Sequence, residues 1–265
     1  MHELKLENVI DTLLALGIQK GDGLLVHSAV QYLGLPEGGL GMYYEAFNSV
    51  LNLTNKRTES QWQSSSNQGT LAVPTFTFAF ARGEAYDPQS TPSAGMGAFS
   101  EFIRQLPEAR RTKHPMQSLA ILGRWTDDLS HRDTLSAFDP GSAFERMLEL
   151  NFQLLLLGAD IQAVSLIHYS EQKANVPYRF WKDFPGIRKA GSERENCTYR
   201  MFARDLSIDP HLNLHPVQIE LQKRGQWNSQ TLNYGQVSIF RISDFIRVAD
   251  EFLEKDPWVF VEGHR

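Results

Sequence analysis

The 265-residue chain is predicted to be an α/β protein, with a mixed sheet flanked by helices and an antiparallel C-terminal part. Short apolar segments alternate with helical patterns, as they do in α/β sheets. These segments lie at 24–26, 70–73, 118–122 and 152–157. Residues 213–237 instead alternate apolar and polar side chains, which is typical of antiparallel strands. Since no repeat or linker divides the sequence, we expect a single domain over residues 1–265.

Apolar residues at helical spacing predict five helices between these strands. The predicted helices span residues 4–18, 42–53, 98–105, 164–174 and 243–254. Ser243 is expected to cap the last helix, because serine side chains satisfy free backbone N–H groups at helix starts. Gly-rich or polar stretches predict loops at 34–41, 52–68 and 83–97.

Polar side chains lie where the predicted strands begin or end. His27 and Ser28 end the first strand, residues 75–77 follow the second, and residues 158–171 follow the strongest one. A further loop precedes Ser118. Because ligands of open α/β sheets bind at the carboxyl ends of strands, these groups are expected to form one cleft.

Composition excludes several classes of protein. The net charge of −5, from 26 basic and 31 acidic residues, gives no electrostatic footprint for nucleic acid. Cys197 is the only cysteine, so an internal disulfide is impossible and a reducing compartment is expected. No signal peptide or membrane-length apolar stretch is visible. We therefore expect a cytoplasmic protein with a small-molecule partner, and homo-oligomerisation stays open.

The sharpest local feature is a histidine three residues before a glutamate in a predicted helix. His168 and Glu171 would share one helical face. A carboxylate beside an imidazole fixes its tautomer and favours proton uptake, as a general base requires. The spacing alone favours an ordinary surface pair, which is common on helices.

Other groups give weaker signals. His27 either binds a ligand or caps a turn, and His114 follows basic residues that would contact phosphates or simply face solvent. The glycines of 34–41 would expose backbone N–H groups to a pyrophosphate, although they match no nucleotide fingerprint. No Cys/His cluster has zinc spacing and no Gly-x-Ser-x-Gly elbow occurs, so no metal is expected.

Six segments taken together resemble the aminoglycoside 3-N-acetyltransferase family, also called the antibiotic N-acetyltransferases. Residues 21–30 are similar to the family's GDTLLVHSSL and residues 69–77 to its GTLVMPTFT. The other four segments occur in the family's order. They are 86–97, 114–123, 139–142 and 154–179.

The resemblance implies an antibiotic N-acetyltransferase-like fold and direct transfer of an acyl group from acyl-CoA, acetyl-CoA above all, to an amine. It implies that His168 is the base, and that Glu171 orients it or contacts the substrate amine. It places the following residues along acyl-CoA: His27, Ser28, Ala29, Val30, Thr75 and Ser118. It further implies substrate contacts for Asp87, Glu171 and Tyr178.

The match departs from the family pattern at two places. Residues 165–168 read Ser-Leu-Ile-His where the family has Thr-Thr-Leu-His, so one hydroxyl is lost. Beyond residue 190 the match to the family is thin. Because the resemblance implies that this region helps to form the acceptor pocket, the acceptor is left open. An aminoglycoside and a nucleotide-linked amino sugar that takes a longer acyl group both stay open, as does a non-catalytic CoA- or carbohydrate-binding protein.

Overall fold

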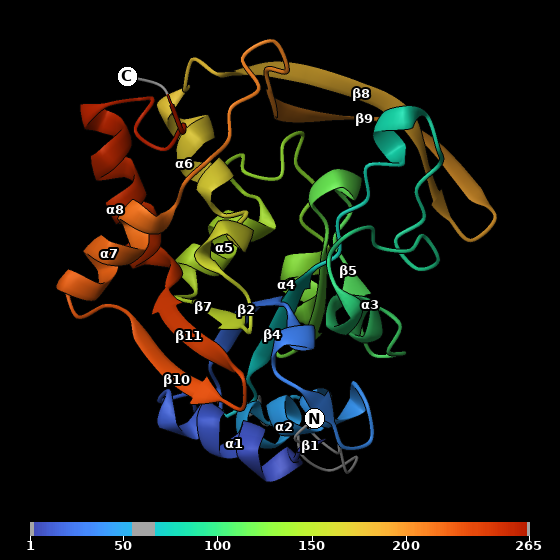
Figure 1. Ribbon diagram of the computed structural model, residues 1–265. Helices are drawn as coiled ribbons and strands as arrows, with labels where there is room; N and C mark the ends of the chain where they lie inside the picture. The colour runs from blue at the N-terminus through green and yellow to red at the C-terminus, as the bar shows by residue number, and fades with distance from the viewer. Residues whose placement is uncertain (1–2, 55–66, 264–265) are drawn as a thin grey trace.

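The computed structural model describes residues 3–54 and 67–263, and its centre is a seven-stranded sheet (Figure 1). The strand order is β10-β11-β7-β2-β4-β6-β5. The bounds are β2 Gly23–Ser28, β4 Thr70–Pro74, β5 Arg110–Arg111, β6 Leu119–Gly123, β7 Gln153–Leu157, β10 Asn228–Leu232 and β11 Gly235–Arg241. The strand pairs β2–β4 and β2–β7 are parallel, whereas the other pairs are antiparallel. The predicted mixed sheet is confirmed.

Side chains of the central strands alternate between two apolar layers. In β2, Leu24 and Val26 pack in one layer and Leu25 in the other. Both layers are covered by helices, so the strands are buried on both faces. This explains why residues 152–157 read as a nearly continuous apolar run.

The helices divide between the two faces of the sheet. The helices α1 Leu6–Ala15, α2 Gly41–Leu51 and α3 Ala98–Arg104 pack on the face of Leu24. The opposite face is covered by α4 Thr126–Ser130, α5 Ala143–Glu149, α6 Ile167–Ala174, α7 His215–Lys223 and α8 Ile242–Lys255. Short elements complete the chain: β1 Glu3–Leu4, β3 Leu35–Pro36, and the 3₁₀ turns η1 Val30–Tyr32, η2 Phe80–Arg82, η3 Pro115–Gln117 and η4 Ile161–Ala163.

A long hairpin lies outside the main sheet. Strands β8 Arg179–Ala190 and β9 Glu193–Arg204 pair only with each other, apart from one bridge between Tyr86 and Arg188. The hairpin extends along the end of the molecule on which α6 lies (Figure 1). The sequence analysis did not predict it, because most side chains of β8 are exposed or half-buried and no apolar alternation results.

Two predictions for the C-terminal part are wrong. Residues 213–237 do not form strands throughout, since α7 occupies their first half and β10 begins only at Asn228. Ser243 does not cap the last helix, because α8 begins at Ile242 with Arg241 as N-cap and no side-chain cap bond. The predicted loop 52–68 lies largely outside the described residues.

No helix within 3–54 and 67–263 is both long and apolar enough to cross a membrane.

Candidate active site

The sheet topology brings the predicted polar segments to one edge. Because β2, β4 and β7 are parallel, their carboxyl ends meet at one edge, where Ser28 ends β2, Thr75 follows β4 and Gly158 follows β7. Strand β6 runs in the opposite direction, so Ser118, which precedes it, lies there too. The convergence expected from the sequence is therefore present in the fold.

Two glycines let backbone segments pack closely at this edge. A Cβ at Gly97, which has φ +84°, would lie 3.1 Å from the Ser28 carbonyl oxygen. A Cβ at Gly158, which has φ +71°, would lie 2.8 Å from the Ala29 oxygen. Both positions combine a left-handed backbone with a tight contact, so any other residue would push the loops away from the end of β2.

The first turn of α6 carries the histidine–glutamate pair. Connection 158–166 leads from the end of β7 to α6, which begins near the carboxyl edge of the sheet (Figure 1) and has His168 as its second residue. The His168 Nδ1 lies 2.5 Å from Glu171 Oε2. The Glu171 side chain is 0% exposed, whereas that of His168 is 30% exposed. An ionised carboxylate can only accept, so Nδ1–H donates and Nε2 keeps its lone pair.

Glu171 has a second ionic neighbour. Arg179 Nε lies 2.8 Å from the same Oε2 atom, with a side chain 9% exposed. Burial opposes ionisation of Glu171, but His168 and Arg179 outweigh it, so the pKa of the carboxyl is lowered. The buried Tyr178 phenol is a neighbour of the carboxylate. Burial raises the pKa of this phenol, and the negative charge of Glu171 raises it further. Glu171 is therefore a buried anion and Tyr178 a neutral neighbour.

The two alternative histidines are in different surroundings. Burial lowers the pKa of His27 to about 4, despite a hydrogen bond with the Ala163 backbone. Burial likewise lowers the pKa of His114 to about 4, despite a hydrogen bond with the Arg200 carbonyl. Both rings are neutral at neutral pH and almost fully buried. Among these three, His168 is the ring that combines solvent access with an ionic partner.

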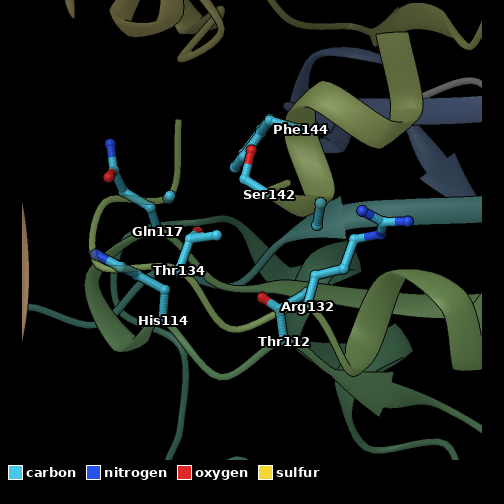
Figure 2. A pocket seen from close by; sticks show the side chains of 9 residues that line it. Thr112, His114, Gln117, Arg132, Thr134, Ser142 and Phe144 are labelled. Carbon is cyan, nitrogen blue, oxygen red and sulfur yellow. The ribbon is translucent and has the colours of Figure 1, made fainter. Parts of the chain in front are cut away.

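A small cavity lies next to His114. Its volume is about 10 Å³, which is room for a single water molecule. Figure 2 shows the lining side chains, which include Thr112, His114 and Gln117 on one side and Ser142 and Phe144 on the other. A cavity of this size holds no coenzyme. The structure gives His114 a packing role, since its ring lies 4.9 Å from that of Tyr199 in an edge-to-face contact.

The hydroxyls of Thr75 and Ser118, which were predicted to lie along acyl-CoA, form hydrogen bonds with Arg111. Arg111 Nε donates to Thr75 Oγ1 and Ser118 Oγ, each at 3.0 Å. Its other nitrogens donate to the carbonyls of Thr91 and Thr75. Thr75, Ser118 and Arg111 are all buried, so the hydroxyls do not face solvent directly. Arg111 is one of the basic residues before His114 that were expected to contact phosphates or face solvent, and the structure shows it instead as the buried centre of this network.

The remaining predicted contacts are spread along the edge. Ala29 and Val30 begin the turn η1, and Ala29 N donates to Leu157 O at 2.9 Å. Asp87 accepts a bond from Gln89 N at 2.8 Å within its own turn. Tyr178 is fully buried and packs against Trp258 in a tilted contact, with ring centroids 5.3 Å apart. In this conformation its ring supports Glu171 and is screened from solvent.

The sequence analysis missed the loop that supports α6. Residues 131–142, called here the support loop, contact the helix on its exposed side. Gln172 Nε2 donates to Asp139 Oδ1 at 2.9 Å, and the ring of Phe138 lies 6.3 Å from that of His168. Only the segment 139–142 had been singled out, and the sequence gives no signal that it reaches α6.

Solved structures of aminoglycoside acetyltransferases have a similar fold. The structure described as AAC-IIIb binary with CoASH superposes with a TM-score of 0.80 over 100% of both chains, at 19% identity. Apo aminoglycoside acetyltransferase AAC(3)-IVa gives 0.77 over 98% of this chain and 92% of its own, at 24% identity. At these identities, the likeness establishes the fold.

Sequence comparison establishes the family. Residues 25–254 match the family model described as aminoglycoside 3-N-acetyltransferase. Aminoglycoside N(3)-acetyltransferase III of Salmonella sp is 31% identical over 96% of this chain and 92% of its own. Aminoglycoside N(3)-acetyltransferase IV of Salmonella sp is 26% identical over 98% of this chain and 91% of its own. The chain belongs to the aminoglycoside 3-N-acetyltransferase family, and the predicted resemblance is confirmed.

Proposed function

We propose that this chain transfers an acetyl group from acetyl-CoA to an amine of an aminoglycoside or related amino sugar, with His168 as the general base. Family membership supports the reaction class, and the names of the relatives support the acceptor class. The observation that carries the proposed mechanism is the pairing of the part-exposed His168 with the buried Glu171 at the carboxyl edge of the sheet.

The acceptor amine must lose a proton before it can form an amide. At neutral pH an aliphatic amine is largely protonated and has no lone pair with which to attack a thioester. His168 Nε2 points away from Glu171, because Nδ1 occupies that side of the ring. This nitrogen takes the proton, and the Glu171 carboxylate stabilises the resulting imidazolium.

The transfer then proceeds without a covalent enzyme intermediate. The amine nitrogen forms a bond with the thioester carbonyl carbon, and the carbon–sulfur bond breaks as the tetrahedral intermediate collapses. CoA leaves as a thiolate, which can recover a proton from His168. The attacking nitrogen loses its second proton to solvent, so a protonated amine and acetyl-CoA give the N-acetyl sugar, CoA with a free thiol and one released proton.

The donor is proposed to lie along the strand ends. The segment 27–30 spans the end of β2 and the residues after it, and its main chain lies next to Gly97 and Gly158. The structure described as AAC-IIIb with CoASH supports a CoA-binding role for this fold. Isothermal calorimetry should therefore detect acetyl-CoA binding, and an absence of heat at millimolar ligand would contradict the proposal.

A thiol-release assay tests the reaction and separates the acceptor classes. Purified protein is mixed with acetyl-CoA and, in turn, with gentamicin, apramycin and a nucleotide-linked amino sugar. We expect release of the CoA thiol with an aminoglycoside, and mass spectrometry should show one added acetyl group. Release only with the nucleotide-linked sugar would favour a biosynthetic acceptor. Release with neither, despite acetyl-CoA binding, would contradict the proposed acceptor class.

A further inference from the structure

Arg179 shares a carboxylate oxygen with the proposed base. It is the first residue of β8, and its Nε lies 2.8 Å from Glu171 Oε2. The same oxygen accepts the 2.5 Å bond from His168 Nδ1. Since Glu171 is fully buried and Arg179 nearly so, solvent screens these interactions weakly. The buried Glu171 carboxylate therefore interacts with both the His168 imidazole and the Arg179 guanidinium.

The charges of the three groups depend on the proton at His168. A guanidinium stays protonated at all ordinary pH values, so Glu171 and Arg179 form a neutral pair while His168 is neutral. After His168 takes a proton, two positive charges share one negative charge. Arg179 therefore opposes part of the stabilisation that Glu171 gives to the imidazolium.

The other titratable groups on the elements around α6 are neutral or already paired. They include His27, Asp139, Tyr169, Lys173, Tyr178 and Asp250, together with Glu145 and Glu149 of α5, which accept from Gly141 N and Arg146, respectively. His27 is neutral at neutral pH because burial lowers the pKa of its ring. The Tyr178 phenol is neutral because burial raises its pKa. Asp139 accepts from Gln172, while Lys173 and Asp250 form an ion pair on the outer side of α6.

Arg179 also connects the pair to the hairpin. Its Nη1 donates to the Phe202 carbonyl of β9 at 3.2 Å. Tyr178 directly precedes Arg179, the first residue of the hairpin. The same backbone segment therefore also positions the Tyr178 ring near Glu171. The orientation of the carboxylate is thus fixed from α6 on one side and from the hairpin on the other.

We propose that Arg179 is a positioning residue that holds Glu171 and sets the pH range in which His168 is free to accept a proton. The inference rests on the proposed role of His168 as the base. It gives a reason for a charged residue at position 179, because packing alone does not require an arginine there.

The experiment compares neutral and charged replacements of Arg179. Arg179→Gln and Arg179→Met remove the charge, Arg179→Lys keeps it, and Arg224→Gln serves as a control. Arg224 also bridges two carboxylates, those of Glu220 and Glu251, but in an exposed pair between α7 and α8. The main readout is a ¹³C-histidine NMR titration of each protein, with the His168 signal assigned by its loss in His168→Gln. The second readout is the acid limb of kcat/KM.

The neutral replacements should shift the His168 titration midpoint upward by about one pH unit, because Glu171 would then act on the imidazolium alone. The acid limb of kcat/KM should shift in the same direction. Arg179→Lys and Arg224→Gln should stay close to the wild-type midpoint. An unchanged midpoint in a folded neutral variant would overturn the proposal, and so would an equal shift in Arg179→Lys.

Two features keep the test decisive. If neither neutral variant folds, Arg179→Lys decides alone, since a wild-type midpoint supports the charge argument and a shifted midpoint contradicts it. The NMR readout needs no turnover. A failure of the proposed base, seen as normal turnover in His168→Ala, is therefore distinguishable from a failure of the inference about Arg179.

Discussion

The Ser136 hydroxyl donates a 2.7 Å hydrogen bond to Gln172 Oε1, one helical turn beyond His168. The amide nitrogen of the same glutamine donates to Asp139. Asp139 in turn accepts from the Ser136 backbone N–H at 2.9 Å. This closed set of bonds fixes the support loop to α6, and Phe138 lies between its two anchor points.

Loss of this attachment should lower stability. Gln172→Ala removes two side-chain hydrogen bonds, each contributing about 1 kcal/mol, so the free energy of unfolding should fall by about 1–3 kcal/mol. Urea denaturation followed by circular dichroism measures the change. Gln222→Ala, at an exposed position on α7, is the matched control and should change stability little. Equal effects of the two substitutions would show that the attachment contributes nothing.

Replacement of His168 should affect turnover far more than donor binding. Loss of a positioned base typically lowers rate by about 10²- to 10⁴-fold. We expect His168→Ala and His168→Asn to lower kcat by that factor, with an acetyl-CoA affinity close to wild type by calorimetry. His114→Gln should keep most of the activity. Near-normal turnover of a folded His168→Ala would assign the proton transfer elsewhere.

Replacement of Glu171 should change the pH dependence as well as the rate. Glu171→Gln keeps the shape of the side chain but removes the charge that stabilises the imidazolium. We expect a lower kcat, by up to the factor expected for His168, and an added effect on KM if the side chain contacts the acceptor amine. The acid limb should shift to lower pH. A wild-type profile would mean that the carboxylate does not act on the base.

Removal of Arg111 should weaken both the fold and donor binding. Arg111→Met removes four donated bonds and leaves the Thr91 carbonyl without this donor, whereas the hydroxyls of Thr75 and Ser118 keep their bond to each other and Ser118 Oγ still donates to Thr75 O. Each lost bond from the charged guanidinium costs about 1–3 kcal/mol, so a large drop in melting temperature is expected. Arg111→Lys should be intermediate, because it keeps the charge but lacks the planar fork. Calorimetry on the Lys variant should show weaker acetyl-CoA binding. Wild-type affinity there would argue against donor contacts at Thr75 and Ser118.

Burial of His114 should make the protein less stable in acid. Its pKa is about 4 in the fold and about 6.5 when unfolded, so between these values the unfolded chain binds more protons. The contribution is present above pH 6.5 and is lost as the pH falls towards 4, by about 2–3 kcal/mol at pH 4.5. In His114→Gln, the loss of stability from pH 7 to pH 4.5 should be smaller by that amount. The exposed His131→Gln should follow wild type, and parallel curves for all three would contradict the prediction.

The sequence was most informative where side chains are buried on both faces of an element. Residues 152–157 could be assigned to a central strand because only a strand covered on both faces tolerates so many leucines. The pair His168 and Glu171 could be singled out because its members are three residues apart in one helix, although its proposed role came from the family resemblance, since spacing alone favours an ordinary surface pair. Both inferences depend on local spacing, which the sequence shows directly.

The sequence was least informative where a side chain meets a distant segment. Arg111 reads as one of several basic residues in a loop, and only the fold reveals that it reaches Thr75 and Ser118. Arg179 likewise lies eight residues from Glu171, across the turn that ends α6. The hairpin was missed because its strands bury few side chains, so the periodicity that identifies a half-buried strand is absent.

The separation of the hairpin from the main sheet bears on how members of this family can diverge. Strands β8 and β9 take part in no ladder of the seven-stranded sheet. Insertions or exchanges near the hairpin tip at Gly191 therefore leave the register of every central strand unchanged, while the base of the hairpin stays attached through Arg179. Natural selection can thus alter the outer hairpin in small steps at little risk to folding.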